Sequence, residues 1–269
     1  MPELPEVETY RRYFEETSLY QPISDVYVED TKLLTTDYDT LNQQLKNHQF
    51  IGTKRVGKNL FAQLDAPYWL HLHFGMTGDL VYFKDDEDTP RFARIIFKFT
   101  NGFRLGFLCP RKFERIGIVE DIEEYLSRKK INKDALEITV EELSKTLNKK
   151  NAPIKSVLLD QSTVAGIGNW IVDEVLYQAK VHPEKKANQL SEKEITEIHK
   201  SMQFVIQTAI DSQANYDDFP ESFLIHARGW GRAGLQDIRA DKCAECGEKI
   251  SISKVGGRTT YFCANRQRI

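Results

Sequence analysis

The chain has 269 residues, with 37 Lys and Arg against 40 Asp and Glu, so its formal net charge is −3. A hydrophobic fraction of 41% and a charged fraction of 29% are typical of globular proteins and exclude general disorder. No apolar run is long enough for a membrane helix, and the N-terminus has neither the basic nor the apolar region of a signal peptide. These features predict a cytoplasmic chain without a membrane partner, and its length favours two domains.

The first part of the chain predicts one helix followed by a β-sandwich or barrel. Apolar residues recur every three or four positions over residues 4–14, which is typical of an amphipathic helix. Short strand-like stretches follow, and Asn101-Gly102 between the last two favours a tight hairpin. The predicted strands are residues 25–28, 50–56, 60–64, 69–74, 80–83, 93–99 and 103–108.

The apolar period then changes to that of helices, which we predict over residues 122–128, 140–147, 154–159, 170–179 and 192–212. Ser191 and Glu194 form a capping-box pattern before the last of these helices. Two strand-like segments near the C-terminus can pair as a hairpin across Gly256-Gly257. The predicted fold is α+β and multidomain, with a sandwich domain over 1–125, a linker over 126–134, a helical domain over 135–225 and a C-terminal hairpin region over 226–269.

The N-terminus carries a candidate nucleophile. An initiator Met before Pro is normally removed, which would leave Pro2 with a secondary amine that is partly unprotonated at neutral pH. Such an amine can form an iminium with a sugar carbon, and Glu3 and Glu6 could transfer protons. The alternative is structural, because Pro and Glu are also common at helix starts, where Glu favours the positive end of the helix dipole.

Two further segments have a functional and a structural interpretation. In the sequence Q-S-T-V-A-G-I-G-N-W of residues 161–170, the glycines could expose helix N–H groups to a phosphate or could form only a turn. In the second segment, Arg111 and Phe113 follow a predicted strand and could contact DNA, with the ring wedged between bases. Phe113 could equally belong to the core, with the cations in solvent.

The C-terminal region is basic and rich in cysteine. Residues 226–269 contain nine Lys or Arg and four Asp or Glu, a local charge of +5. Cys243, Cys246 and Cys263 have a spacing that predicts a Zn²⁺ site. The expected fourth position holds Arg266, which cannot ligate. Either a non-Cys ligand or water completes the site, or the region folds without tightly held metal.

Taken together and in this order, these motifs resemble the formamidopyrimidine-DNA glycosylase and endonuclease VIII family. The chain is closer to the formamidopyrimidine branch, and the resemblance spans essentially its whole length. It rests on M-P-E-L-P-E-V-E-T at the start, V-G-K-N-L around Lys58, H-F-G-M-T-G at 73–78, A-G-I-G-N-W at 165–170 and G-R-T-T-Y-F-C at 257–263.

The resemblance implies a β-sandwich carrying the first helix, a helix-two-turn-helix domain and a zinc-finger-like hairpin, with double-stranded DNA bound between the domains. It implies a monomer that is a bifunctional DNA glycosylase and AP lyase, nucleoid-associated if the source is bacterial. Pro2 would attack the sugar C1′ of a damaged nucleotide, and Glu3 would be the acid. Phosphates would be bound by Lys58 on the catalytic face and by His73, Asn169 and Arg258. The gap left by a flipped base would be filled by Met76, Arg111 and Phe113. Glu6 would support the damage pocket.

Some residues depart from the family pattern. Cys109 and Glu114 stand where the family usually has Asp and Gly, at the two ends of the segment that holds Arg111 and Phe113. The segment 218–232 is short and poor in Gly, so we expect lesions other than 8-oxoguanine to be preferred. The alternative to an enzyme is a family member that binds DNA or abasic sites with reduced or no catalysis. A zinc-ribbon interaction protein would not explain Pro2, Glu3 and Lys58 together.

Overall fold

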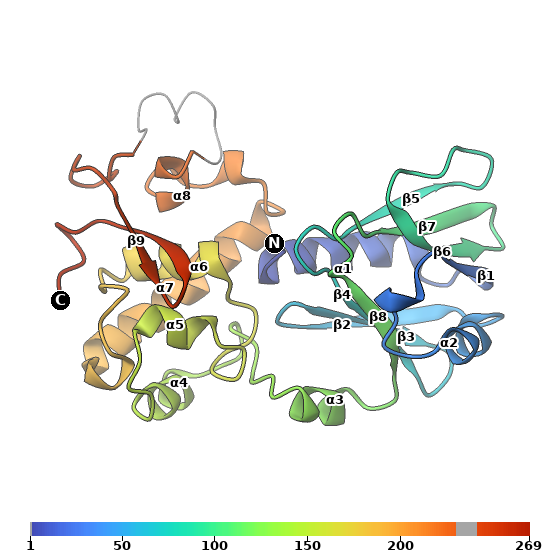
Figure 1. Ribbon diagram of the computed structural model, residues 1–269, viewed down its shortest axis with the longest axis horizontal. Coiled ribbons are helices and arrows are strands. Elements are labelled where there is room, and N and C mark those ends of the chain that lie inside the picture. The colour runs from blue at the N-terminus through green and yellow to red at the C-terminus, as the bar shows by residue number, and fades with distance from the viewer. Residues whose placement is uncertain (1, 230–240) are drawn as a thin grey trace. The chain divides into compact units, whose positions relative to one another are not determined.

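The computed structural model describes residues 2–229 and 241–269. The described chain forms two compact units, which Figure 1 shows as a strand-rich and a helix-rich part. The first, here called the sandwich unit, contains Pro2 and residues 6–129. The second, the helical unit, contains residues 3–5 and the described residues from 130 onward.

The sandwich unit contains two antiparallel four-stranded sheets, in the orders β1-β6-β7-β5 and β2-β3-β4-β8. Their strands are β1 (Ile23–Val28), β2 (Phe50–Val56), β3 (Asn59–Leu64), β4 (Trp69–His73), β5 (Asp79–Lys84), β6 (Ala93–Phe99), β7 (Phe103–Leu108) and β8 (Arg115–Val119). Apolar side chains of both sheets form one core, in which the rings of Phe50 and Phe97 meet edge to face at 6.1 Å. This confirms the predicted β-sandwich.

Helix α1 (Leu4–Ser18) confirms the predicted N-terminal helix and extends it by one turn. Its Phe14 packs edge to face on Phe50 at 5.0 Å and so joins the sandwich core. Helices α2 (Tyr38–Leu45) and α3 (Ile122–Arg128) complete the unit, with the one-turn 3-10 helix η1 (Thr31–Leu33). The prediction found α3 but missed α2, which has only Leu41 and Leu45 as buried residues.

The helical unit contains α4 (Val140–Leu147), α5 (Ile154–Leu159), α6 (Asn169–Gln178), α7 (Glu192–Asp211) and α8 (Leu224–Ala227), with the 3-10 helices η2 (Ala187–Gln189) and η3 (Tyr216–Asp218). Helix α6 is buried from Trp170 to Tyr177 because it lies in the centre of this unit's core. The capping box before α7 is confirmed, since the Glu194 N–H donates to Ser191 Oγ at 3.3 Å. None of the helices in residues 2–229 and 241–269 is both long and apolar enough to cross a membrane.

The predicted C-terminal hairpin is present as β9 (Ser251–Val255) and β10 (Arg258–Phe262). Gly256 and Gly257 form its turn with φ angles of 57° and 75°, a region that Gly adopts without strain. Helix α6 packs against β10. The hairpin is therefore held on the most buried helix of the helical unit.

Candidate functional site

A buried carboxylate caps the N-terminus of α6. Glu3 is only 2% exposed, and its Oε1 and Oε2 accept hydrogen bonds from the backbone N–H groups of Trp170 at 3.0 Å and Ile171 at 3.2 Å. These are two of the N–H groups that a helix start leaves without intrahelical partners, and a negative charge there is favoured by the helix dipole. The fold thus fixes the orientation of one predicted catalytic group.

Two glycines make room for this arrangement. A Cβ atom on Gly168 would lie 2.1 Å from Cδ of Glu3, and one on Gly166 would lie 2.6 Å from Leu4 Cδ1. The Leu4 N–H also donates to the Gly166 carbonyl at 3.1 Å. The G-I-G turn therefore holds the N-terminal segment. The interpretation of this turn as a phosphate cradle was wrong for the N–H groups of Trp170 and Ile171, because Glu3 uses both.

Asn169 and Arg258 lie beside the junction of α6 and β10. Asn169 is the first residue of α6, and its Nδ2 donates to the Thr259 carbonyl at 3.1 Å. Arg258 is exposed at the start of β10, next to the glycine turn. The helical unit therefore brings together two residues to which the resemblance gives phosphate contacts, and it presents Arg258 to solvent.

The sequence analysis missed a buried ion pair that fixes this junction. Lys155 is fully buried in α5, and its Nζ donates to Asp173 Oδ1 of α6 at 2.7 Å and to the Thr259 carbonyl at 2.9 Å. Burial raises the pKa of Asp173, and the cations of Lys155 and Arg228 counter that shift. The signal in the sequence is a single charged residue within the mostly apolar helix I-K-S-V-L-L.

In the sandwich unit, Lys58 and His73 lie near each other. Lys58 is in the turn between β2 and β3, and His73 ends β4. Burial lowers the pKa of His73, and the nearby cations Lys58 and Arg115 lower it further, so the ring is neutral at pH 7. Its Nδ1 accepts from the Gly75 N–H at 3.2 Å, which leaves the proton on Nε2. His73 can therefore donate one hydrogen bond to an anion.

Two loops of the sandwich unit bring Met76, Arg111 and Phe113 to the surface. Phe113 is 51% exposed and Met76 is 36% exposed, and the Arg111 guanidinium lies 5.2 Å from the Phe113 ring centroid. Gly75 allows the loops to touch, since a Cβ there would lie 2.7 Å from the Phe113 carbonyl carbon. The interpretation of Phe113 as a core residue was wrong.

Behind these loops lies Glu114, one of the departures from the family pattern. It is fully buried, and its Oε1 accepts from the Thr77 hydroxyl at 3.3 Å. Its Oε2 is also buried and has no hydrogen-bond partner among the described residues. The second departure, Cys109, is fully buried, and burial raises the pKa of its thiol to about 12. Cys109 therefore behaves as a small apolar side chain.

Pro2 and Glu6 lie at the start of the chain, and both are half-buried. Glu6 is in the first turn of α1, one turn before Tyr10. Burial raises the pKa of Tyr10, and the negative charges of Asp79 and Glu6 add to that shift. The prediction that Met1 is removed concerns a residue outside the described ones.

The three cysteines of the C-terminal region lie together. The Sγ atoms of Cys243, Cys246 and Cys263 are all within 4.8 Å of one another. Zn–S bonds of about 2.3 Å place sulfurs roughly 3.8 Å apart around a tetrahedral ion, so the thiols match three corners. Among the described residues no fourth Cys, His, Asp or Glu joins the group, and the Arg266 side chain interacts with Cys243. These residues do not fit a four-ligand zinc site.

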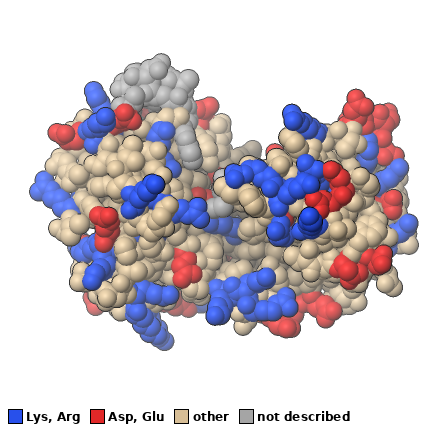
Figure 2. All heavy atoms as spheres, viewed as in Figure 1, with Lys and Arg blue, Asp and Glu red and all other residues tan. Residues whose placement is uncertain are grey.

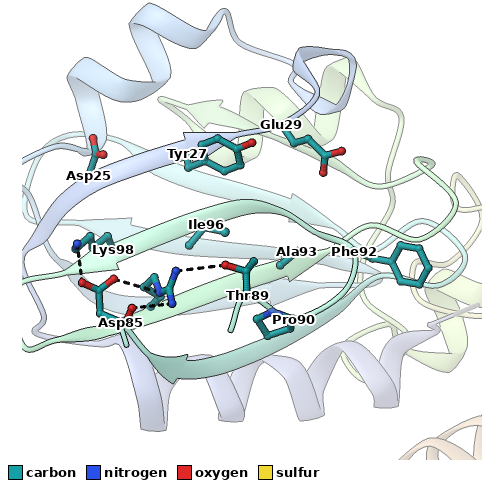
Figure 3. Close-up of a pocket in the computed structure, with 11 residues that line it drawn as sticks. Asp25, Tyr27, Glu29, Asp85, Thr89, Pro90, Phe92, Ala93, Ile96 and Lys98 are labelled. Carbon is teal, nitrogen blue, oxygen red and sulfur yellow. Dashed lines mark hydrogen bonds and ion pairs between the residues drawn. The ribbon is translucent and has the colours of Figure 1, made fainter. Parts of the chain in front are cut away.

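A groove of about 520 Å³ lies on the outer face of the β1-β6-β7-β5 sheet, and Figure 3 shows the side chains that line it. None of the predicted site residues is among them. Asp85 forms ion pairs within the groove with Lys98 at 2.6 Å and Arg104 at 3.2 Å. Asp25 and Glu29 pair with Lys46 and Arg94, which do not line the groove. On the face shown in Figure 2, Lys and Arg are spread over the molecule, and the densest group of Asp and Glu lies at the upper right.

Comparison with known proteins gives matches over most of the chain. Residues 1–116 match the formamidopyrimidine-DNA glycosylase N-terminal domain, and residues 131–219 match the formamidopyrimidine-DNA glycosylase H2TH domain. The formamidopyrimidine-DNA glycosylase of Bacillus subtilis is 34% identical over 277 residues, which cover 99% of each chain. The protein of that name from Arabidopsis thaliana is 32% identical over 289 residues, which cover 100% of this chain and 71% of the plant protein.

Solved structures of a Lactococcus lactis protein are similar over the full length. Its complex with DNA containing N7-benzyl-Fapy-dG has a TM-score of 0.88 at 31% identity and covers 100% of both chains. Its non-covalent complex with DNA containing an AP site has a TM-score of 0.86 at 30% identity and covers 99% of this chain and 100% of the other. With both domains matched and full-length relatives above 30% identity, this chain belongs to the formamidopyrimidine-DNA glycosylase family.

Proposed function

We propose that the chain is a bifunctional DNA glycosylase and AP lyase that removes oxidised bases from double-stranded DNA. The observation that carries the proposal is the buried Glu3 carboxylate, which accepts hydrogen bonds from two backbone N–H groups of α6. Glu3 directly follows the candidate nucleophile Pro2 in the sequence. A carboxyl group fixed in this way is suited to proton transfer beside a reacting amine. The crystallised relatives bind DNA with a Fapy-dG lesion or an AP site, which supports the same substrate class here.

In the proposed reaction, the Pro2 nitrogen forms a bond to the sugar C1′ while the bond from C1′ to the base breaks. The Glu3 carboxylate takes up the proton that the Pro2 nitrogen releases and delivers it to the sugar-ring oxygen as the ring opens, while the departing base takes a proton from water. The product is an iminium between Pro2 and C1′. Transfer of a C2′ proton to water then allows elimination of the 3′ phosphate, which nicks the strand.

The other predicted residues bind the DNA around the reacting nucleotide. Lys58 and the neutral His73 from the sandwich unit, with Asn169 and Arg258 from the helical unit, have the donors needed for phosphate oxygens. The exposed Met76 and Phe113, with Arg111, would fill the space left by the flipped base, and Glu6 would support the damage pocket. No proposed step uses a metal ion on the three cysteines.

Borohydride trapping on abasic DNA tests the lyase proposal, because only an iminium is reduced to a stable covalent complex. The chain that begins at Pro2 should trap, and Pro2→Gly should trap far less. The matched control is the same chain with Met1 retained, which has no secondary amine. Equal trapping by that form would show that Pro2 is not the nucleophile, and tight abasic-site binding without trapping would favour the binding-only alternative.

We also propose that lesions other than 8-oxoguanine are excised fastest. The short segment 218–232 offers few backbone N–H groups to a flipped purine, although residues 230–232 lie outside the described part of the chain. Single-turnover rates on matched duplexes with 8-oxoguanine, a formamidopyrimidine, 5-hydroxyuracil and an abasic site would rank the substrates. Fastest excision of 8-oxoguanine opposite cytosine would contradict the proposal.

A further inference from the structure

The side chain of Arg266 places a positive charge beside the three cysteines of the C-terminal region. We propose that Arg266 takes the place of the fourth ligand and supplies the positive charge of the metal, so that the hairpin is held in place without structural zinc. Arg266 stands where a second C-x2-C pair would place its last Cys, counted from Cys263. A guanidinium has only donors and stays protonated, so it can pair with sulfur but cannot ligate a metal ion.

The contacts of Arg266 place it inside this cluster. Its Cζ lies 4.8 Å from the centroid of the Tyr177 ring, and its charge interacts with Cys243. Its Nη1 is buried and has no hydrogen-bond partner among the described residues. The Tyr177 hydroxyl in turn lies 3.1 Å from Cys243 Sγ. Cys243 therefore has a cation and a hydroxyl as neighbours besides the two other thiols. In a zinc site the ion is the cation beside the sulfurs, whereas here the guanidinium of Arg266 is the cation that interacts with Cys243.

The hairpin also has anchors that need no metal. Gln267 is 1% exposed, and its Oε1 accepts from the Cys263 N–H at 2.8 Å while its Nε2 donates to the Val181 carbonyl at 2.9 Å. The buried Lys155 bonds Thr259 and Thr260 of β10, each at 2.9 Å.

Apolar packing adds to these polar anchors. Cys243 and Cys263 pack with Tyr177, Leu224 and Ile250 in a small apolar cluster. A module of this size usually needs a metal or disulfides because its own core is small. This one instead shares a core and buried hydrogen bonds with α6 and its neighbours.

Metal analysis of the full-length chain tests the proposal independently of DNA activity. After exposure to zinc and dialysis against a chelator, the wild type should retain almost no zinc, and the chelator should leave its melting temperature unchanged. Arg266→Cys completes four thiols and should retain about one zinc per chain. Arg268→Cys is the matched control, since it adds a thiol at an exposed position two residues away and should gain no zinc.

About one zinc per wild-type chain after dialysis, or a wild-type melting temperature that falls with chelator, would overturn the proposal. Equal zinc retention by Arg268→Cys and Arg266→Cys would also count against it, because the place of Arg266 would then not matter. If Arg266→Cys does not fold, Arg266→Ala tests the structural role of Arg266 instead. It should lower the melting temperature without adding zinc, and an unchanged melting temperature would overturn the structural role of Arg266.

Discussion

In two turns of this molecule a glycine leaves space for a buried carboxylate. The two turns differ in the hydrogen-bond donors that they offer to that carboxylate. In the helical unit, Gly168 leaves space for Glu3, whose two oxygens accept from two backbone N–H groups. In the sandwich unit, Gly78 leaves space for Glu114, since a Cβ on Gly78 would lie 2.9 Å from Glu114 Cγ. Glu114 Oε1 accepts a hydrogen bond from the Thr77 hydroxyl, whereas its Oε2 has no hydrogen-bond partner among the described residues.

The difference indicates which buried charge stabilises the fold. A carboxylate with two charge-assisted hydrogen bonds at a helix N-terminus recovers much of the solvation that it loses. A buried oxygen without a partner keeps its full desolvation cost. The space beside a glycine is therefore not enough to make a buried carboxylate stabilising. The N–H donors at the N-terminus of α6 make Glu3 the more favourable of the two.

The largest effect is expected from closing the space beside Glu3. Gly168→Ala would place a Cβ 2.1 Å from Glu3 Cδ and so expel the carboxylate. Single-turnover excision should fall at least about 100-fold, the low end for losing a general acid. Gly52→Ala is the control, because its Cβ would meet only Gln63 Oε1 at 3.7 Å.

Glu3→Gln removes the proton-transferring group but leaves the space beside Gly168 unchanged, so it distinguishes a chemical role of Glu3 from a steric effect of Gly168→Ala. Excision should again fall at least about 100-fold while binding to lesion DNA persists. If Glu3→Gln lost binding and excision together, or if Gly168→Ala kept full activity, the role assigned to Glu3 would be wrong.

A further buried carboxylate, Glu174, should give a pH-dependent effect on stability. Its oxygens accept from the N–H groups of Leu224 and Ile225 at 3.0 and 3.1 Å, but burial raises its pKa from 4.5 to about 7. The folded state thus binds this proton more tightly than the unfolded state. Its contribution to stability is fully present below about pH 4.5 and is lost as pH rises to about 7, a change of about 3 kcal/mol.

Denaturant unfolding between pH 4.5 and pH 8 would measure this change against Glu174→Gln, which has no titrating group at that position. The difference in unfolding free energy between wild type and variant should shift in favour of the variant as pH rises. A difference that is constant with pH would contradict the raised pKa.

A smaller gain is expected in the sandwich unit. Glu114→Gln removes the buried charge without changing the side-chain length, so the free energy of unfolding should rise by about 1 kcal/mol. Glu16→Gln, on the exposed side of α1, is the matched control and should change little. A clear loss of stability in Glu114→Gln would mean that Glu114 is as well satisfied as Glu3.

The smallest expected effects concern phosphate contacts in the two units. Lys58→Ala and Arg258→Ala should each weaken DNA binding and reduce the slope of binding against salt by about one. Asn169→Ala should weaken binding but leave the slope nearly unchanged, because it removes no charge. An unchanged slope for Arg258→Ala would show that the hairpin does not reach DNA.

Local patterns were enough for much of the fold. Strands β2, β6 and β7 and helices α3, α4 and α5 have the bounds that periodicity predicts, because alternation and helical spacing report which face is buried. The missed elements α2, β8 and α8 are short or depend on distant partners. Strand β8 pairs with β4, with Arg115 opposite His73.

The sequence by itself determined the family resemblance, most of the elements in their order and the residue types available for chemistry, since motifs and periodicity are local properties. The tertiary structure alone decided how those residues are used. Glu3 takes its hydrogen bonds from Trp170, 167 positions away, and the Lys155 ammonium meets Thr259 over 104 positions. Which donors surround a buried charge depends on such long-range contacts, and these contacts decide whether the charge stabilises the fold or strains it.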